Sequence, residues 1–286
     1  MKLVILIPGY NEEATLGATL SELPRNVTGF TEVEWLVVDD GSTDRTAAIA
    51  REHGARVVSL RGNQGLGKAF SLGLQSALDR GADVIAQTDA DNQYEARDLD
   101  ALVGAIVAGA DFAIGRRDVA RREDFSAAKK WVHRTGALAF RWVSGVRVAD
   151  PVSGFRAYSR RTAERIHVVN RFSYTLEVLL QAGRQSWAVR EIPVRSRVAV
   201  RPSRLAATWR EFFGRSLLCL GNGLVLHRPF LLFAWALLPW VLLARVLAES
   251  QGSAWAATQL AAVSAVLAAG IWLYRLGLME KAGKAA

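Results

Sequence analysis

The sequence predicts an α/β fold with a mostly parallel sheet and flanking helices, followed by an interfacial amphipathic helix and a two-helix transmembrane hairpin. Three observations predict it. Short apolar runs alternate with helical patterns up to residue 115, a basic amphipathic stretch begins near residue 204, and two long apolar segments come last. The 286 residues are 51% hydrophobic, which is enough for a substantial core. A single cysteine, Cys219, excludes an intramolecular disulfide framework and a multi-cysteine zinc site.

The first 115 residues supply most of the predicted sheet. Continuous apolar strands separated by helices are typical of a parallel sheet that is covered on both faces. Gly54, Gly81 and Gly109 stand where the first helices should end. The expected strands are Leu3–Ile7, Trp35–Val38, Val57–Leu60, Val84–Ala86 and Phe112–Ile114, and the expected helices cover residues 13–22, 45–53, 68–80 and 98–108.

Residues 116–228 are less regular. Up to residue 203 the pattern still predicts helices and strands of the same domain, so we place its boundary there. Residues 204–228 carry apolar side chains at helical spacing with arginines between them, which predicts a helix lying in the membrane interface. The further expected elements are a helix near 126–143, a strand at Phe155–Ser159, a helix near 174–183 and a strand near 187–197.

The C-terminal part, residues 229–286, predicts a membrane hairpin with a short cytoplasmic tail. Residues 230–248 contain one charged side chain, Arg245, and residues 255–274 contain none. A helix of about 20 residues spans the hydrocarbon layer. The connector lacks lysine and arginine, whereas basic residues precede and follow the hairpin, so the main domain should face the cytoplasm. The alternative is a buried hairpin of a soluble domain.

The net charge of +9 is distributed unevenly. Residues 1–115 hold 9 Lys/Arg and 17 Asp/Glu, residues 116–228 hold 23 and 8, and the remainder holds 4 and 2. A basic chain commonly indicates nucleic-acid binding. Here the acidic part favours a site for a cation and a nucleotide, and the basic part favours a phosphorylated lipid and an anionic membrane surface. We therefore expect no nucleic-acid partner.

A glycine-rich segment follows the third expected strand. The run from Gly62 to Ala69 fits a P-loop except at its last position, where alanine replaces the Ser or Thr that would hold Mg²⁺. That change argues against an ATPase. The loop amides and Lys68 could still bind an anion, and the alternative is a plain turn between strand and helix.

Acidic residues follow the first, second and fourth expected strands. Asp89 and Asp91 are two apart, so in an extended segment their carboxylates point the same way and suit Mg²⁺ or Mn²⁺. The alternative is that acidic residues here only form turns and helix caps, with Asn11 or Asp44 as caps. Capping accounts for one residue of each cluster, so we expect a single nucleotide site at these strand ends.

Together, the motifs resemble those of family 2 glycosyltransferases with the GT-A (Rossmann-like) fold. The similarity is to the branch of dolichyl-phosphate mannose synthases and polyprenyl-phosphate glycosyltransferases, and it runs from residue 3 to about residue 205. The matching motifs are Pro8-x-Tyr10-Asn11-Glu12, Val38-Asp39-Asp40-Gly41-Ser42-x-Asp44, Asn63-x-Gly65-x-Gly67-Lys68-Ala69, Asp89-Ala90-Asp91-x-Gln93, Gly115-x-Arg117, Ser153-Gly154-Phe155-Arg156 and Glu191-Ile192-Pro193-Val194.

The resemblance implies specific roles at these positions. Asp89, Asp91 and Arg117 would be catalytic, and Asp91 with Gln93 would bind Mg²⁺ or Mn²⁺. The family's Arg-x5-Lys element fits less clearly: Arg204 takes the lysine place, while Arg197 or Arg201 could take the arginine place. The expected donor-binding residues are Pro8, Tyr10, Glu12, Val38, Asp40, Lys68, Asp89, Ala90, Asp91, Arg117, Arg201 and Arg204.

The function that the resemblance implies is an inverting transfer of one hexose from a nucleotide sugar, of the GDP-mannose or UDP-glucose type, to a polyprenyl or dolichyl phosphate at the cytoplasmic membrane face. A lipid phosphate is already an anion at neutral pH, so it needs cations rather than a base. Arg122, Lys130 and Arg134 are the candidates for holding it. One alternative is a hydroxyl acceptor with Asp150 as base, and another is a non-catalytic module that binds anionic membranes or nucleic acid.

Overall fold

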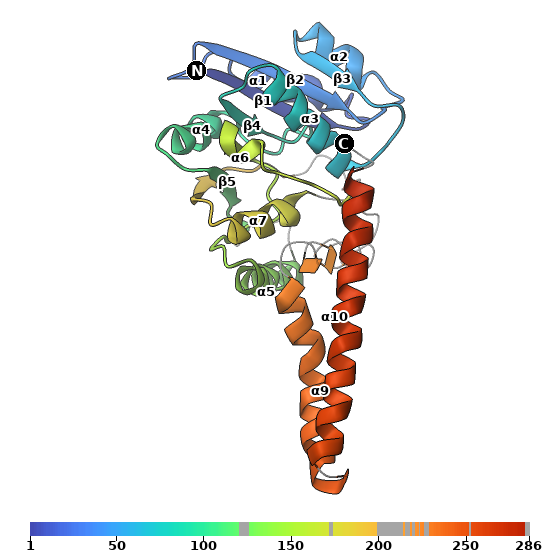
Figure 1. Ribbon diagram of the computed structural model, residues 1–286. Helices are drawn as coiled ribbons and strands as arrows, with labels where there is room; N and C mark the ends of the chain where they lie inside the picture. Colours follow the sequence, from blue (N-terminus) through green and yellow to red (C-terminus); the bar gives the residue numbers. More distant parts are fainter. Residues whose placement is uncertain are drawn as a thin grey trace. The chain divides into compact units, whose positions relative to one another are not determined.

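The computed structural model describes residues 1–119, 126–171, 174–198, 214, 218, 221–222, 224–225, 229–251 and 253–283. It divides into two compact units, Met1–Ser216 and Leu217–Ala286. The first unit is a sheet covered by helices, and the second contains the helical pair α9 and α10 (Figure 1).

Seven strands of the first unit form one mixed sheet with the order β3-β2-β1-β4-β6-β5-β7. All neighbouring pairs are parallel except those that involve β6, which runs antiparallel to β4 and β5. The strands are β1 (Lys2–Gly9), β2 (Glu32–Asp39), β3 (Arg56–Ser59), β4 (Val84–Gln87), β5 (Phe112–Arg117), β6 (Arg156–Ser159) and β7 (Val189–Val194). The predicted α/β class and mostly parallel sheet are confirmed.

The helices of this unit connect the strands and lie against the sheet. They are α1 (Leu16–Glu22), α2 (Thr46–Glu52), α3 (Leu66–Asp79), the 3₁₀ turn η1 (Ala96–Asp98), α4 (Leu99–Val107), α5 (Ala127–Ser144), α6 (Arg160–Ala163) and α7 (Thr175–Arg184). The short α6 and η1 were not predicted, because three or four residues carry no readable helical period. Positive φ angles of 72°, 79° and 99° at Gly54, Gly81 and Gly109 confirm the predicted helix ends.

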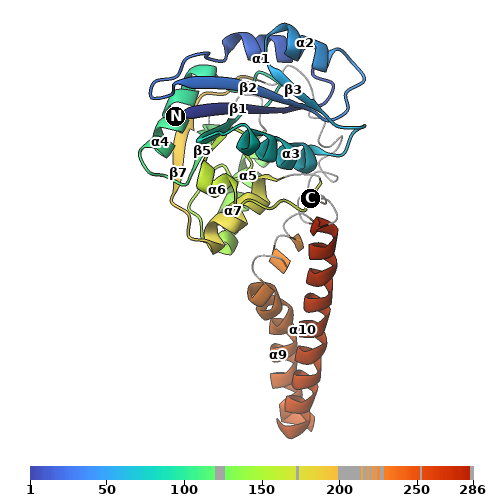
Figure 2. The ribbon, with the colours of Figure 1, turned by 45° about the horizontal axis from the view of Figure 1, so that its top comes forward.

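Both faces of the sheet are covered, and β1 shows how. Leu3, Ile5 and Ile7 of β1 are fully buried in a core cluster that also includes residues of α1 and α4. On the other face, α3 approaches so closely that a Cβ on Gly73 would lie 2.3 Å from Leu6 Cδ1. Glycine is therefore the residue that fits here. Figure 2 shows α1 and α2 on one side of β1 and β2, and α3 on the other.

The segment after β7 departs from the expected strand. Residues 187–197 were expected to be extended, but β7 stops at Val194. Ser196 instead forms an isolated antiparallel bridge with Tyr94. The extended pattern thus continues for two residues beyond the sheet and pairs with a loop that follows β4.

The second unit contains α9 (Pro229–Gln251) and α10 (Ser253–Gly283). Within the described residues, Ala257–Leu276 is the one segment long and apolar enough to cross a membrane, and Leu232–Val246 is a shorter apolar stretch. The apolar stretches at 230–248 and 255–274 lie within these helices, and both helices extend into the polar connector between the stretches. Glu, Ser and Gln end an apolar stretch without ending a helix. A hairpin of two membrane spans stays a prediction.

Candidate active site

Polar segments meet at one edge of the sheet. β1 ends at Gly9, β2 at Asp39 and β4 at Gln87, and these strands are parallel. β6 runs the other way, and its first residue, Arg156, pairs with Gln87. The segment before β6 therefore reaches the same edge as the ends of the parallel strands, which is where open α/β sheets bind ligands.

Asp89 and Asp91 follow β4 at this edge. Burial, and then the neighbouring Asp91 charge, raise the pKa of Asp89 to about 7. The Asp91 carboxylate accepts the backbone N–H of Gln93 at 3.2 Å and also contacts its side-chain amide. Two crowded carboxylates beside an amide are hard oxygen ligands that a divalent cation would stabilise.

Other ligands would have to complete such a cation site. In the part of the chain that the structure describes, no group of three or more His, Cys, Asp or Glu side chains could hold a metal ion. A cation at Asp91 and Gln93 would therefore take further oxygens from a bound substrate or water, as Mg²⁺ usually does.

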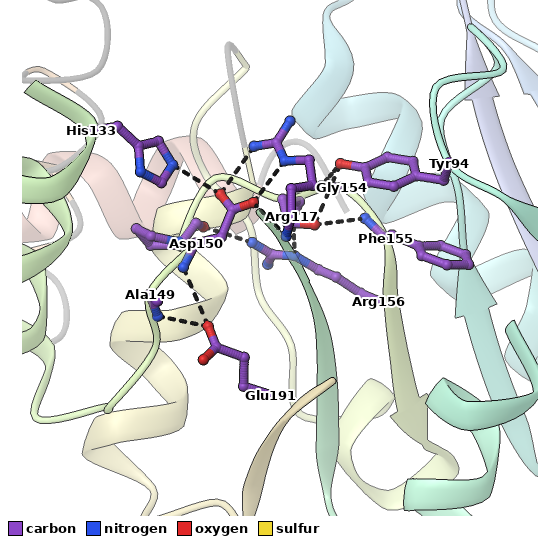
Figure 3. A network of polar contacts seen from close by, with 11 residues as sticks. Tyr94, Arg117, His133, Ala149, Asp150, Gly154, Phe155, Arg156 and Glu191 are labelled. Carbon is purple, nitrogen blue, oxygen red and sulfur yellow. Dashed lines mark hydrogen bonds and ion pairs between the residues drawn. The ribbon is translucent and has the colours of Figure 1, made fainter. Parts of the chain in front are cut away.

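Gly154 packs directly against the Asp89 carboxylate. A Cβ at this position would lie 2.5 Å from both carboxylate oxygens, so any larger residue would displace them. The Gly154 N–H donates to the Tyr94 hydroxyl at 3.0 Å, and the Tyr94 ring stacks on Phe155 with centroids 5.0 Å apart. Burial raises the pKa of Tyr94 to about 12, so the hydroxyl stays neutral. The hydroxyl points at Gly154 in Figure 3.

The side chain of Arg156 forms hydrogen bonds with the backbone of the segment that carries Gly154. This side chain is fully buried and donates to the carbonyls of Ser153, Pro151 and Thr175 at 2.7, 2.9 and 3.1 Å. A buried guanidinium needs such partners because an unpaired buried charge is costly. The bonds to Pro151 and Ser153 fix the backbone of residues 151–155 beside Asp89, and the bond to Thr175 ties this segment to the start of α7.

Arg117, the last residue of β5, forms a bidentate ion pair with buried Asp150. Its Nε and Nη2 donate to Asp150 Oδ2 and Oδ1 at 2.6 and 3.0 Å. His133 of α5 contacts the same carboxylate through Nε2 at 3.1 Å. Glu191 accepts the backbone N–H groups of Ala149 and Asp150 at 2.6 and 3.3 Å. Figure 3 shows Arg117 and His133 converging on Asp150.

This arrangement argues against Asp150 as a general base. Burial alone would raise the pKa of its carboxyl group, but the Arg117 charge and hydrogen bonds from His133 and Arg117 hold it well below its usual range. An effective general base has a pKa near the working pH. Asp150 instead orients the guanidinium of Arg117.

The glycine-rich loop is a turn rather than an open anion cradle. The N–H groups of Gln64 and Gly65 donate to the two Asp40 carboxylate oxygens at 2.7 and 2.9 Å. The Gly67 N–H donates to the Arg171 carbonyl at 3.0 Å, and a Cβ on Gly67 would lie 1.8 Å from another carbonyl oxygen. These amides are already bonded, so the structure favours the turn over the anion site.

The expected donor-binding residues of the first two strand ends lie side by side. Pro8 of β1 is in register with Val38 of β2. Glu12 is buried, and its N–H donates to Thr46 Oγ1 at 2.7 Å. Burial raises the pKa of Asp40, although its two backbone hydrogen bonds oppose the shift. Tyr10 is half-buried in the same segment.

Two further expected donor-binding residues, Ala90 and Lys68, lie near different strand ends. The Ala90 carbonyl accepts the hydroxyls of Thr15 and Thr19 at 2.9 and 3.2 Å, which ties α1 to the Asp89–Asp91 segment. Lys68 lies in the first turn of α3, after β3, on the outer side of β2. The structure thus brings Ala90 next to the acidic pair, while Lys68 belongs to a more distant strand end.

The acceptor candidates Lys130 and Arg134 lie on α5, half-buried and exposed respectively. The same helix exposes Trp131, Leu138 and Trp142 by 67%, 57% and 63%. Arg122 lies outside the described residues. His133 lies on the face of α5 that also carries Lys130, about opposite Trp131 and Trp142, and it contacts Asp150.

Arg197, one of the two candidates for the arginine place of the Arg-x5-Lys element, contacts a carboxylate. Its Nη2 lies 2.9 Å from Glu22 Oε2, so its guanidinium is already paired. The choice between Arg197 and Arg201 for the arginine place stays a prediction. Arg201, Arg204 and most of the predicted amphipathic helix over 204–228 lie outside the described residues.

Five contributors to the site had no role in the sequence interpretation: Tyr94, His133, Gly154, Arg156 and Glu191. Gly154, Arg156 and Glu191 belong to recognised motifs, but a motif does not say what its residues touch. Tyr94 and His133 lie in segments with no comparable signal. Their contacts depend on side chains that are 17 to 60 residues away in sequence.

Comparison with known proteins gives consistent relatives. The profile of glycosyl transferase family 2 matches residues 4–167. A polyprenol monophosphomannose synthase of Mycolicibacterium smegmatis is 30% identical over 207 residues, covering 67% of this chain and 76% of that protein. A dolichyl-phosphate hexose transferase of Haloferax volcanii is 31% identical over 196 residues, covering 67% and 81%.

A solved structure has the same fold. Glucosyl-3-phosphoglycerate synthase of Mycobacterium tuberculosis superposes with a TM-score of 0.62 at 23% identity, covering 78% of this chain and 79% of that chain. Crystals of that enzyme have contained UDP with Mn²⁺ or Mg²⁺. The similarity at this identity concerns the fold, and the predicted GT-A class is confirmed.

Proposed function

Because this chain belongs to glycosyl transferase family 2, we propose that it transfers one hexose from a nucleotide sugar to a polyprenyl phosphate. The relatives named for polyprenol and dolichyl phosphate support this acceptor. The observation that carries the proposal is the meeting of Asp89, Gly154 and the Arg117–Asp150 pair at the carboxyl edge of the sheet. The acidic residues expected to bind the donor and the ion-paired Arg117 therefore lie at the same edge of the sheet.

On the donor side, the nucleotide would lie against the ends of β1 and β2. Pro8, Tyr10, Glu12, Val38 and Asp40 would hold the base and ribose. Within the proposal, Asp89 and Ala90 contact the sugar diphosphate, and Arg117 faces its charge. Lys68 would lie at the margin of this site, and Arg201 and Arg204 would add further positive charge.

Asp91 and Gln93 are the residues that would hold Mg²⁺ or Mn²⁺. Their carboxylate and amide oxygens suit such a cation, and the neighbouring Asp89 is buried, which together with the Asp91 charge raises its pKa to about 7. A bound cation would offset the negative charge that develops on the leaving diphosphate. The complex of the structural relative with UDP and Mn²⁺ supports a divalent cation beside the donor.

The acceptor phosphate needs orientation and cations, not deprotonation. Its second pKa is near 6, so at neutral pH it is largely a dianion and can attack the anomeric carbon directly. The binding of Asp150 to Arg117 agrees with this, since the hydroxyl-acceptor alternative would use Asp150 as base. Lys130 and Arg134, with Arg122, would attract the lipid phosphate from the basic part of the chain.

The membrane would supply the acceptor and anchor the enzyme. The proposal places α9 and α10 across the bilayer as two spans, with the first unit on the cytoplasmic side. The apolar segment Ala257–Leu276 supports one span. The charge distribution, with no Lys or Arg in the connector, supports the orientation.

The proposal is tested with purified full-length protein in detergent. GDP- and UDP-linked hexoses are each incubated with a short polyprenyl phosphate and Mn²⁺, and the labelled lipid product is measured. We expect one donor class to be used, and Asp91→Ala to lower turnover at least about 100-fold. Turnover that Asp91→Ala leaves unchanged would refute the metal role. No transfer from any donor, or transfer only to hydroxyl acceptors, would refute the assigned reaction.

A further inference from the structure

The chain that leaves β7 lies along the loop that carries the proposed metal ligands. The Arg197 N–H donates to the Gln93 carbonyl at 2.8 Å, and Ser196 bridges Tyr94. The N–H of Arg195, the residue before Ser196, donates to Asp98 Oδ2 at 2.6 Å. The loop from residue 93 to 98 therefore has a backbone partner from a segment about 100 residues later.

Arg197 adds a side-chain cluster to this pairing. Its Nη1 and Nη2 donate to the two Glu22 carboxylate oxygens at 3.0 and 2.9 Å. The same Nη1 donates to Asn92 Oδ1 at 2.9 Å, and Asn92 Nδ2 donates to Glu22 Oε1 at 3.3 Å. Glu22, Asn92 and Arg197 thus form a closed set of contacts, the Glu22–Asn92–Arg197 cluster, in which each side chain touches the other two.

Asn92 is the residue between the two proposed metal ligands. Its φ is 55°, in the left-handed region that few non-glycine residues adopt without support. This turn brings the Gln93 N–H and side-chain amide onto the Asp91 carboxylate. A side chain anchored on both sides fixes that backbone conformation, and so fixes how Asp91 and Gln93 face each other.

The cluster contributes more to geometry than to stability. The Arg197 and Glu22 side chains are 41% and 38% exposed, and ion pairs at such exposure contribute little to folding. Three hydrogen-bonded side chains at a metal loop are nevertheless the arrangement that orients metal ligands from outside the coordination sphere. This combination predicts an effect on cation binding that exceeds the effect on unfolding.

We propose that Arg197 is a positioning residue for the divalent cation: together with Glu22 it holds Asn92, so that Asp91 and Gln93 present their oxygens to the metal. The inference rests on the metal role proposed above. Because Arg197 is engaged in this way, it orders the loop rather than contacting the donor diphosphate.

The test uses the full chain in detergent with Arg197→Gln, Glu22→Gln and Arg197→Lys. Mn²⁺ binding is measured by the electron paramagnetic resonance of free Mn²⁺ at a fixed concentration of nucleoside diphosphate, which supplies the further oxygens, and turnover is measured across a Mn²⁺ titration. We expect Arg197→Gln and Glu22→Gln to raise the half-saturating Mn²⁺ about tenfold, while kcat at saturating Mn²⁺ returns to within about twofold of wild type. Arg197→Lys keeps the charge without the bidentate geometry and should lie in between.

Arg160→Gln is the matched control. Arg160 pairs with Glu164 at 3.0 Å with side chains 43% and 49% exposed, so the change removes a similar ion pair away from the loop. Its Mn²⁺ dependence should equal that of wild type. The double variant Glu22→Gln/Arg197→Gln should be no weaker for Mn²⁺ than either single variant, since both changes disrupt one cluster.

Three results would overturn the inference. In the first, Arg197→Gln and Glu22→Gln bind Mn²⁺ as wild type does. In the second, their kcat falls and added Mn²⁺ does not restore it. In the third, wild type transfers sugar without needing a divalent cation, which would remove the metal role and the positioning role together. Wild-type Mn²⁺ dependence with unaffected variants would remove the positioning role alone.

Discussion

Gly154 shows how a single missing side chain shapes the candidate site. The Asp89 carboxylate occupies the space where a Cβ would stand, at 2.5 Å from both oxygens. Tyr94 holds the Gly154 N–H, and the buried Arg156 holds the preceding carbonyl of Ser153. The acidic group therefore rests against backbone that two other side chains keep in place.

Gly154→Ala should reduce transfer without unfolding the protein. The added methyl group must displace Asp89 by about 1 Å, and a displacement of that size at reacting groups can cost about 100-fold in rate. The measurement is kcat/KM for the donor, together with thermal unfolding. An unchanged kcat/KM would show that the position of Asp89 is not critical.

Gly136→Ala provides the control for that substitution. Gly136 lies in α5, and among the described residues no atom outside its own stretch of helix backbone lies within 4 Å of the place where its Cβ would be. Alanine in a helix interior is about 0.5–1 kcal/mol more favourable than glycine, so this variant should be equally active and slightly more stable.

At the scale of elements, the Arg117–Asp150 pair joins the end of β5 to the segment between α5 and β6. His133 adds α5, and Glu191 adds β7 through the backbone of residues 149 and 150. Two elements, β5 and α5, thus contact the buried Asp150 carboxylate, and β7 holds the backbone that carries it. The glycine-rich loop also joins distant segments, because its N–H groups donate to the Asp40 carboxylate and to the Arg171 carbonyl.

Asp150→Asn should destabilise the protein and lower transfer through Arg117. Removing one partner of a buried ion pair costs about 3 kcal/mol of unfolding free energy. Because the native pKa of Asp150 is lowered, the pair stabilises the protein above the unfolded value of 3.8, and this stabilisation is lost as the pH falls below it. Urea unfolding between neutral and acidic pH should therefore show a smaller acid loss in the variant.

Comparing Arg117→Gln with Asp150→Asn distinguishes an Asp150 that orients Arg117 from an Asp150 that acts as a general base. If Asp150 acts by orienting Arg117, the single variants should lose transfer to similar degrees and the double variant should be no worse than either. A base would behave differently. Asp150→Asn would then abolish transfer while Arg117→Gln retained much of it, and stability would be close to wild type.

At the scale of the whole molecule, the uneven charge corresponds to the proposed division of labour. The acidic first 115 residues supply the strand ends with Asp40, Asp89 and Asp91. The basic stretch that follows supplies α5, with its exposed tryptophans and cations. The near-neutral remainder supplies the apolar helices α9 and α10.

A chain ending at Ser216 tests this division. It should be soluble without detergent and bind the donor, because the first unit has its own core. Transfer to a water-soluble short polyprenyl phosphate should persist, whereas transfer to a long one in vesicles should fall about 100-fold with loss of the shared membrane. Size-exclusion chromatography and product assays on both acceptors decide this. An aggregated protein would indicate that the hairpin belongs to a soluble core.

The sequence alone determined the fold class and the order of elements, because apolar runs and helical patterns of ordinary length reflect local burial. Each expected strand of the sheet is present, and the acidic motifs lie at the strand ends where parallel topology requires them. Glycine at the helix ends was also readable, since a left-handed backbone favours glycine wherever it occurs.

Only the tertiary structure decided what each polar residue touches. Asp150 was a base only in the hydroxyl-acceptor alternative, the glycine-rich loop could bind an anion or form a plain turn, and either Arg197 or Arg201 could take the family's arginine place. The structure shows that Asp150, the loop amides and Arg197 have partners distant in the chain: Arg117, Asp40 and Glu22 respectively. The physical reason is that a polar side chain has several acceptable partners, and the one it meets depends on how non-consecutive strands and helices pack.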